Sequence, residues 1–111
     1  MSKDTITEVG FQKCGHPMFY ELLEKMATIH SAKNHDYAEK ENPLSNLSSS
    51  KRIGVEPWIA TWIRIQDKIS RIEQFIKNQG VLEVKDESVE DTLIDLANYA
   101  ILCLVLYREK V

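Results

Sequence analysis

Apolar residues recur at intervals of three and four positions in three segments of the chain, which is the spacing of one helix face. The segments run from about residue 17 to 37, from 58 to 77, and from 86 or 88 to 109. The stripes expected to be buried on the first two helices are Phe19, Leu22, Leu23, Met26 and Ile29, and Trp58, Trp62, Ile65, Ile69, Ile72 and Ile76. The third helix is apolar almost all round from Leu93 onward, so we expect the other helices to cover it. The pattern predicts one all-α domain over residues 1–111, a compact bundle of three to four main helices.

Signals for helix ends support these boundaries. Pro17 suits a first helical turn, where its missing N–H does no harm, and Asp86 or Ser88 could cap the third helix. The stretch 38–57 has no helical period, and it is long for a connection in a compact domain. We therefore interpret it as either a functional lid or a mobile loop.

A row of acidic and amide side chains on the third helix is the most informative feature. Glu87, Asp91, Asp95 and Asn98 follow one another at steps of four, four and three, which places them along one face. An ionised carboxylate at Asp95, among apolar neighbours, is costly unless it is paired or bound to a metal. Oxygen ligands in a row suit Mg²⁺ or Mn²⁺, with phosphate oxygens completing the shell. Alternatively, Glu87 and Asp91 interact with the helix dipole, and Asp95 pairs with a cation across the bundle.

The second helix offers a possible partner face. Arg64, Asp67, Lys68 and Arg71 lie on one side of it. Asp67 could be a metal ligand while the cations face phosphate, or the four residues could form weak ion pairs in solvent. The pattern does not decide between these interpretations.

The end of the first helix is a third candidate. The segment Lys33-Asn34-His35-Asp36-Tyr37 combines a cation, an amide, an imidazole, a carboxylate and an aromatic ring. Such a set can bind a base or a sugar, and it is also what a polar helix C-terminus looks like.

Composition and charge narrow the classes of function. The chain of 111 residues has a formal net charge of −3, which does not favour binding to nucleic acid or to an anionic membrane. The apolar run 93–107 is shorter than a membrane span and contains Asp95, and no signal peptide is visible. Cys14 and Cys103 match no zinc spacing and are interpreted as reduced thiols of a cytoplasmic protein. No glycine-rich phosphate loop, nucleophile elbow or paired cysteine motif is present.

These segments together resemble the all-α nucleotide pyrophosphatases, the MazG-like and dimeric-dUTPase-like proteins, and most closely their small phage and bacterial relatives. The resemblance rests on residues 33–37, on 58–72 and on 87–99, whose sequence is Glu-Ser-Val-Glu-Asp-Thr-Leu-Ile-Asp-Leu-Ala-Asn-Tyr. It implies that acids on two neighbouring helices hold Mg²⁺, and that water cleaves the α–β linkage of a nucleoside triphosphate. It also implies a dimer or tetramer. Asp91 and Asp95 match the family's terminal acidic pair, whereas Asp67 lacks the second acid that the family places one turn away.

The leading hypothesis is a Mg²⁺-dependent (or Mn²⁺-dependent) pyrophosphohydrolase that acts on a (deoxy)nucleoside triphosphate and forms a homo-oligomer. Its catalytic residues would be Asp67, Asp91 and Asp95, and its metal ligands Asp67, Glu87, Asp91 and Asp95. The substrate would be bound by Lys33, Asp36, Tyr37, Arg64, Lys68, Arg71 and Asn98. Two alternatives are a phage protein that sequesters a nucleotide without cleaving it, and an interaction module in which Asp95 pairs with Arg64 or Arg71.

Overall fold

The computed structural model describes residues 12–37, 44, 47–78 and 88–109, except for the side chains of residues 36 and 37. In these residues it contains three α-helices, α2 (Pro17–Tyr37), α3 (Pro57–Lys77) and α4 (Val89–Glu109), and one 3₁₀-helix, η2 (Ser49–Ile53). The described part of the chain has no strand. The expected all-α class and the three main helices are confirmed. No helix among the described residues is both long and apolar enough to cross a membrane.

Local signals explain where α3 and α4 begin. Pro57 is the first residue of α3, where a helix needs no N–H from it. At the start of α4 the hydroxyl of Ser88 accepts a hydrogen bond from the Asp91 backbone N–H at 3.0 Å. Ser88 therefore acts as the cap of α4, as one of the two expected alternatives had it.

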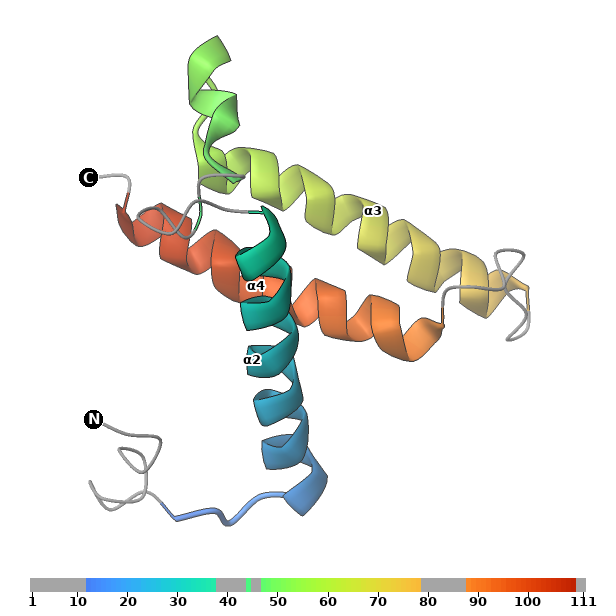
Figure 1. The fold of residues 1–111 in the computed structure, drawn as a ribbon. Coiled ribbons are helices and arrows are strands. Elements are labelled where there is room, and N and C mark those ends of the chain that lie inside the picture. Colours follow the sequence, from blue (N-terminus) through green and yellow to red (C-terminus); the bar gives the residue numbers. More distant parts are fainter. Residues whose placement is uncertain (1–11, 38–43, 45–46, 79–87, 110–111) are drawn as a thin grey trace.

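The helices are arranged as one packed pair with a third helix across it. Figure 1 shows α3 and α4 side by side, and α2 running at a steep angle to both. The core joins Leu44 and Leu47, which precede η2, to Leu106 on α4, and all three are at most 9% exposed. Trp58, Tyr99, Leu102 and Val105 pack against this cluster. The described part of the stretch 38–57 is thus anchored to α4, and it contains a helix that the sequence pattern did not predict.

Gly54 lets the chain turn from η2 into α3. Its φ of 81° and ψ of 13° lie in the left-handed region, where a side chain would be strained. Its backbone N–H donates to the Lys51 carbonyl at 3.1 Å. The glycine thereby closes η2 and brings it against the first turns of α3.

The expected burial of the helix stripes is wrong in part. On α2 Met26 is 8% exposed, but Phe19 is 58% exposed, because α2 crosses α4 steeply and no other described helix lies beside its N-terminal half (Figure 1). On α3 Ile65 is buried, while Trp62 and Ile76 are 51% and 68% exposed. Ile63, which lies off the predicted stripe, is exposed as well.

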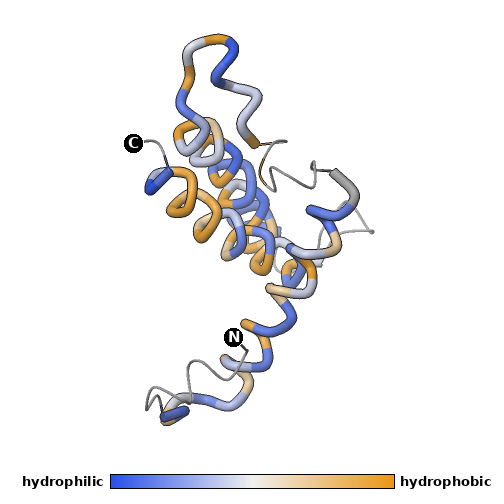
Figure 2. The backbone as a smooth tube through the Cα atoms, turned by 60° about the vertical axis from the view of Figure 1, so that its left-hand side comes forward, coloured by the Kyte–Doolittle hydropathy of each residue, from blue (hydrophilic) through white to orange (hydrophobic). Residues whose placement is uncertain are grey.

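The expectation that α4 is covered on every side is also wrong for this chain. Figure 2 shows hydrophobic residues on successive turns of α4 near the C-terminus. Only one side of the helix meets α3, so Leu93, Ile101, Leu104 and Tyr107 remain about half exposed. A second copy of the chain could cover this surface, and homo-oligomerisation stays a prediction.

Candidate functional site

Asp95 on α4 connects the three α-helices through its side chain. Lys33 on α2 donates a hydrogen bond from Nζ to Oδ1 of Asp95 at 3.0 Å, and Lys68 on α3 donates from Nζ to Oδ2 at 3.2 Å. The Asp95 side chain is 24% exposed, that of Lys68 is 15% exposed and that of Lys33 is 55% exposed. The prediction that Asp95 meets positive charge is therefore satisfied by two lysines from two helices, rather than by Arg64 or Arg71.

The two lysines determine the charge state of Asp95. Burial raises the pKa of the Asp95 carboxyl, but the hydrogen bonds and positive charges of Lys33 and Lys68 lower it by more. The pKa of Asp95 therefore lies below its ordinary value of 3.8. The carboxylate stays ionised at neutral pH because it is paired.

This pKa shift predicts how stability depends on pH. The unfolded chain binds a proton at Asp95 more readily than the folded chain, so the stability that Asp95 contributes is complete above its ordinary pKa of 3.8. It is lost as the pH falls through the lower, folded-state pKa. We expect the difference in free energy of unfolding between the wild type and Asp95→Asn to be constant near neutral pH and to shrink in acid. Urea denaturation of both proteins from about pH 6 to about pH 2.5 measures it. A difference that grows in acid would contradict the pairing.

Two further residues on α4 extend the polar face that Asp95 begins. Asn98 lies one turn after Asp95, and its Nδ2 donates to the backbone carbonyl of Met26 at 3.3 Å. This bond leaves the amide oxygen of Asn98 as an acceptor. Tyr99 lies four residues after Asp95, and Lys68 Nζ is 5.9 Å from the centre of its ring. Residues at steps of three and four share a helix face, so Asp95, Asn98 and Tyr99 face α2 and α3 together.

A cavity of about 470 Å³ lies beside these residues, and we call it the central cavity. Its polar lining consists of His30, Lys33, Asn34, Arg64, Asp95, Asn98 and Tyr99, and its apolar lining of Leu47 and Leu102. All three α-helices contribute to this lining. The volume falls in the range of small-molecule sites, about 300–1,000 Å³.

Arg64 differs from the two lysines of the site because no acidic side chain among the described residues pairs with it. In the part of the chain that the structure describes, no hydrogen bond or ion pair holds its guanidinium group. Lys33 and Lys68, by contrast, are both bound to Asp95. Among the described residues, Arg64 is therefore the cation of the central cavity without an acidic partner, while Lys33 and Lys68 share the single negative charge of Asp95.

The structure brings together five of the residues that the sequence predicted for the site. Lys33, Lys68 and Asp95 are in contact, and Arg64 and Asn98 line the same cavity. The other described candidates, Asp67, Arg71 and Asp91, are exposed on the helix surface and do not line it. Glu87 and the side chains of Asp36 and Tyr37 lie outside the described residues.

The donor set of the described residues does not fit a metal centre in this arrangement. Each oxygen of Asp95 accepts a hydrogen bond from an ammonium group, which a metal ion would have to displace. Across the described ranges, no three His, Cys, Asp or Glu side chains gather into a group that could hold a metal. The expected Mg²⁺ or Mn²⁺ site stays a prediction, and no chemical step is derived from it.

Sequence reasoning missed several residues that line the central cavity, among them Tyr99, Leu47 and Leu102. Tyr99 could have been found, because it continues the row of Asp91 and Asp95 at a step of four. Leu47 carries no such signal, since it stands in a stretch without periodicity and only its contact with α4 places it there.

Comparison with known proteins gives one match. No curated protein and no solved structure is significantly similar to the chain. Residues 33–106 match a protein family, and this span contains every polar residue that lines the central cavity except His30. The chain belongs to that family, which is described as nucleotide modification associated domain 1.

Proposed function

We propose that the protein binds a nucleotide in the central cavity between α2, α3 and α4. The observation that carries this proposal is the Arg64 guanidinium, which has no partner among the described residues, in a cavity that also contains an aromatic ring and two side-chain amides. A cation without a protein partner, beside a cavity of ligand size, favours an anionic ligand. The family description points in the same direction, since it associates the domain with nucleotides.

The remaining groups in the cavity suit the uncharged part of a nucleotide. The amides of Asn34 and Asn98 and the imidazole of His30 can form hydrogen bonds with a base or a sugar. The ring of Tyr99 offers a surface on which a base can stack. Lys33, Lys68 and Asp95 hold these walls in place by joining the helices, which preorganises the cavity.

Binding assays with a nucleotide panel test this proposal. We expect at least one of the common ribo- or deoxyribonucleoside triphosphates to bind in isothermal titration calorimetry. We expect Arg64→Gln to weaken that binding about 10- to 100-fold, because a hydrogen bond to a charged group contributes about 1.5–3 kcal/mol. Arg108→Gln is the matched control, since Arg108 is exposed on α4 and does not line the cavity. It should change the Kd by less than about twofold.

The same panel separates binding from hydrolysis. With Mg²⁺ present, release of pyrophosphate and nucleoside monophosphate would support the pyrophosphohydrolase hypothesis. Loss of that turnover in Asp91→Asn, without loss of stability, would assign a catalytic role to an exposed acid for which the described residues provide no ion-pair partner. Binding without turnover would support sequestration. If no nucleotide binds, or if Arg64→Gln and Arg108→Gln bind equally well, the proposed function is wrong.

A further inference from the structure

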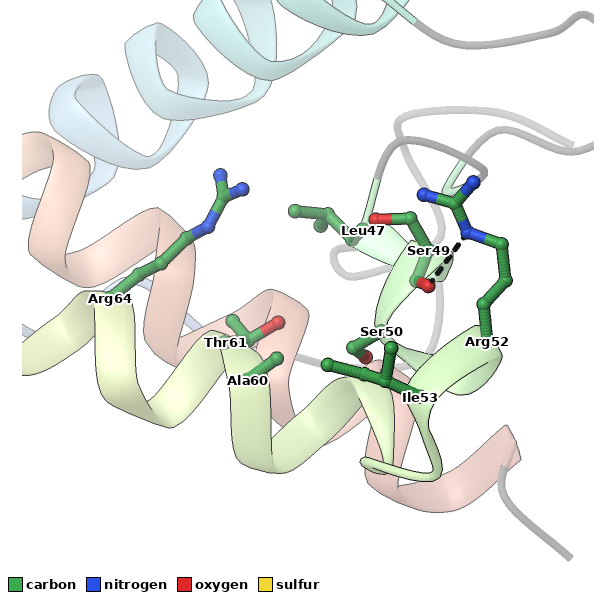
Figure 3. Close-up of a pocket in the computed structure, with 8 residues that line it drawn as sticks. All are labelled: Leu47, Ser49, Ser50, Arg52, Ile53, Ala60, Thr61 and Arg64. Atoms are coloured by element: carbon green, nitrogen blue, oxygen red, sulfur yellow. Dashed lines mark hydrogen bonds between the residues drawn. The ribbon is translucent and has the colours of Figure 1, made fainter.

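A second cavity of about 470 Å³ lies between η2 and the first turns of α3, and we call it the η2 cavity. It shares Leu47 and Arg64 with the central cavity, so the two cavities adjoin each other at these residues. Figure 3 shows Arg64 on one side of the η2 cavity and Arg52 on the other, with Leu47 and Ser49 between them in that view.

The charges that line the η2 cavity have one sign. Its lining contains Arg52 and Arg64 and, among the described residues, no aspartate or glutamate. The only hydrogen bond that the structure describes for Arg52 runs from Nε to the Ser49 carbonyl at 3.3 Å (Figure 3). This bond leaves the terminal nitrogens of the Arg52 guanidinium as donors. Two arginines without an acidic partner favour an anion between them.

The hydroxyl group of Ser50 also lies at the η2 cavity, and it points to a ligand independently of the arginines. Its Oγ is buried and has no hydrogen-bond partner among the described residues. The neighbouring hydroxyl of Thr61, by contrast, has a hydrogen-bond partner, because it donates to the Pro57 carbonyl at 2.8 Å. A buried hydroxyl without a partner is unfavourable, so the missing partner is expected to come from a ligand.

We infer that the η2 cavity binds the phosphate groups of the nucleotide whose base and sugar occupy the central cavity. Phosphate oxygens match the planar donor pattern of arginine and can also accept a hydrogen bond from the Ser50 hydroxyl. Arg64 lies where the two cavities meet and would contact the phosphate nearest the sugar. This inference rests on the proposed function, and it places the phosphates at Arg52 and Arg64 rather than at Lys33 and Lys68, which Asp95 already holds.

Substitution of Arg52 tests this inference with a matched control beside it. We expect Arg52→Gln to weaken binding of the tightest nucleoside triphosphate about tenfold or more, and to leave binding of the corresponding nucleoside unchanged. Lys51→Gln is the control, because Lys51 is exposed in the same 3₁₀-helix and does not line the cavity. Calorimetry with inorganic pyrophosphate provides a second probe, which should bind the wild type and bind Arg52→Gln about tenfold more weakly.

Ser50→Ala is expected to affect stability and ligand binding differently. Because the Ser50 hydroxyl has no partner in the described part of the chain, its removal should leave thermal stability unchanged or raise it slightly. The same substitution should weaken triphosphate binding several-fold. A purely structural role for Ser50 would lower stability and binding together.

The outcomes distinguish this inference from the proposed function. If a nucleotide binds and Arg64→Gln weakens it, but Arg52→Gln behaves like Lys51→Gln, then the proposed function stands and the phosphate assignment is overturned. If Arg52→Gln weakens the nucleoside as much as the triphosphate, the assignment is overturned as well. If neither a nucleotide nor pyrophosphate binds the wild type, both proposals fail.

Discussion

Replacing Leu106 with alanine is expected to lower the free energy of unfolding by about 2–5 kcal/mol, which is the usual range for a buried leucine. Leu106 is 5% exposed, and it lies in the core cluster with Leu44 and Leu47. Removing its side chain leaves a cavity between α4 and the segment before η2. Because Leu47 lines both the central cavity and the η2 cavity, the proposed function also predicts weaker nucleotide binding in this variant.

Leu104→Ala is the matched control for this prediction. Leu104 lies on the same helix two residues earlier and is 49% exposed, so its truncation should cost less than about 1 kcal/mol. Urea denaturation of the two variants and the wild type at one protein concentration measures the difference. An equal loss in both variants would contradict the assigned buried face. A loss in Leu104→Ala that depends on protein concentration would show that a second copy covers the exposed side of α4.

The second large effect is expected at Asp95. Replacing it with asparagine should lower the free energy of unfolding by about 1–3 kcal/mol, because the substitution leaves Lys68 without its counter-charge. The Lys68 side chain is 15% exposed, so its ammonium group cannot recover full hydration in the folded state. Lys33 contributes less, because its side chain is 55% exposed and water screens its pairing.

Double-mutant cycles test whether Lys68 contributes more than Lys33 to the stabilising interaction with Asp95. Lys68→Met and Lys33→Met are each combined with Asp95→Asn, and the coupling energy of each pair is obtained from denaturation. We expect the coupling between Asp95 and Lys68 to exceed that between Asp95 and Lys33. Asp67→Asn is the control for the loss of a carboxylate, since Asp67 is exposed on α3 and should change stability by less than about 0.5 kcal/mol. The interpretation fails if Asp67→Asn costs as much as Asp95→Asn.

The sequence around Asp95 requires a counter-charge but does not specify which one. A carboxylate in an apolar helix requires positive charge, and that requirement follows from solvation alone. A metal ion and a pair of lysines satisfy it equally well, and the sequence contains candidates for both. In the structure, lysines from α2 and α3 pair with Asp95. Asp95 therefore links the three helices and also lines the central cavity.

The sequence by itself determined the helical class, the three α-helices and the Ser88 cap, because these depend on periodicity and on neighbours within a few residues. It also made Lys33, Arg64 and Asn98 candidates, since each belonged to a group of polar side chains within one helix: the end of the first, one side of the second and the acidic row of the third. The burial of α2 could not be predicted in this way, because a stripe indicates which face packs but not how far a neighbouring helix extends.

Only the tertiary structure decided which cations meet Asp95, and that Arg64 has no partner among the described residues. The steep crossing of α2 over α4 brings Lys33 to Asp95, and spacing along a single helix contains no information about that angle (Figure 1). Arg52 and Ser50 join Arg64 only because Leu44 and Leu47 anchor an aperiodic segment to α4. Such contacts between residues distant in the sequence arise from packing, which local patterns do not encode.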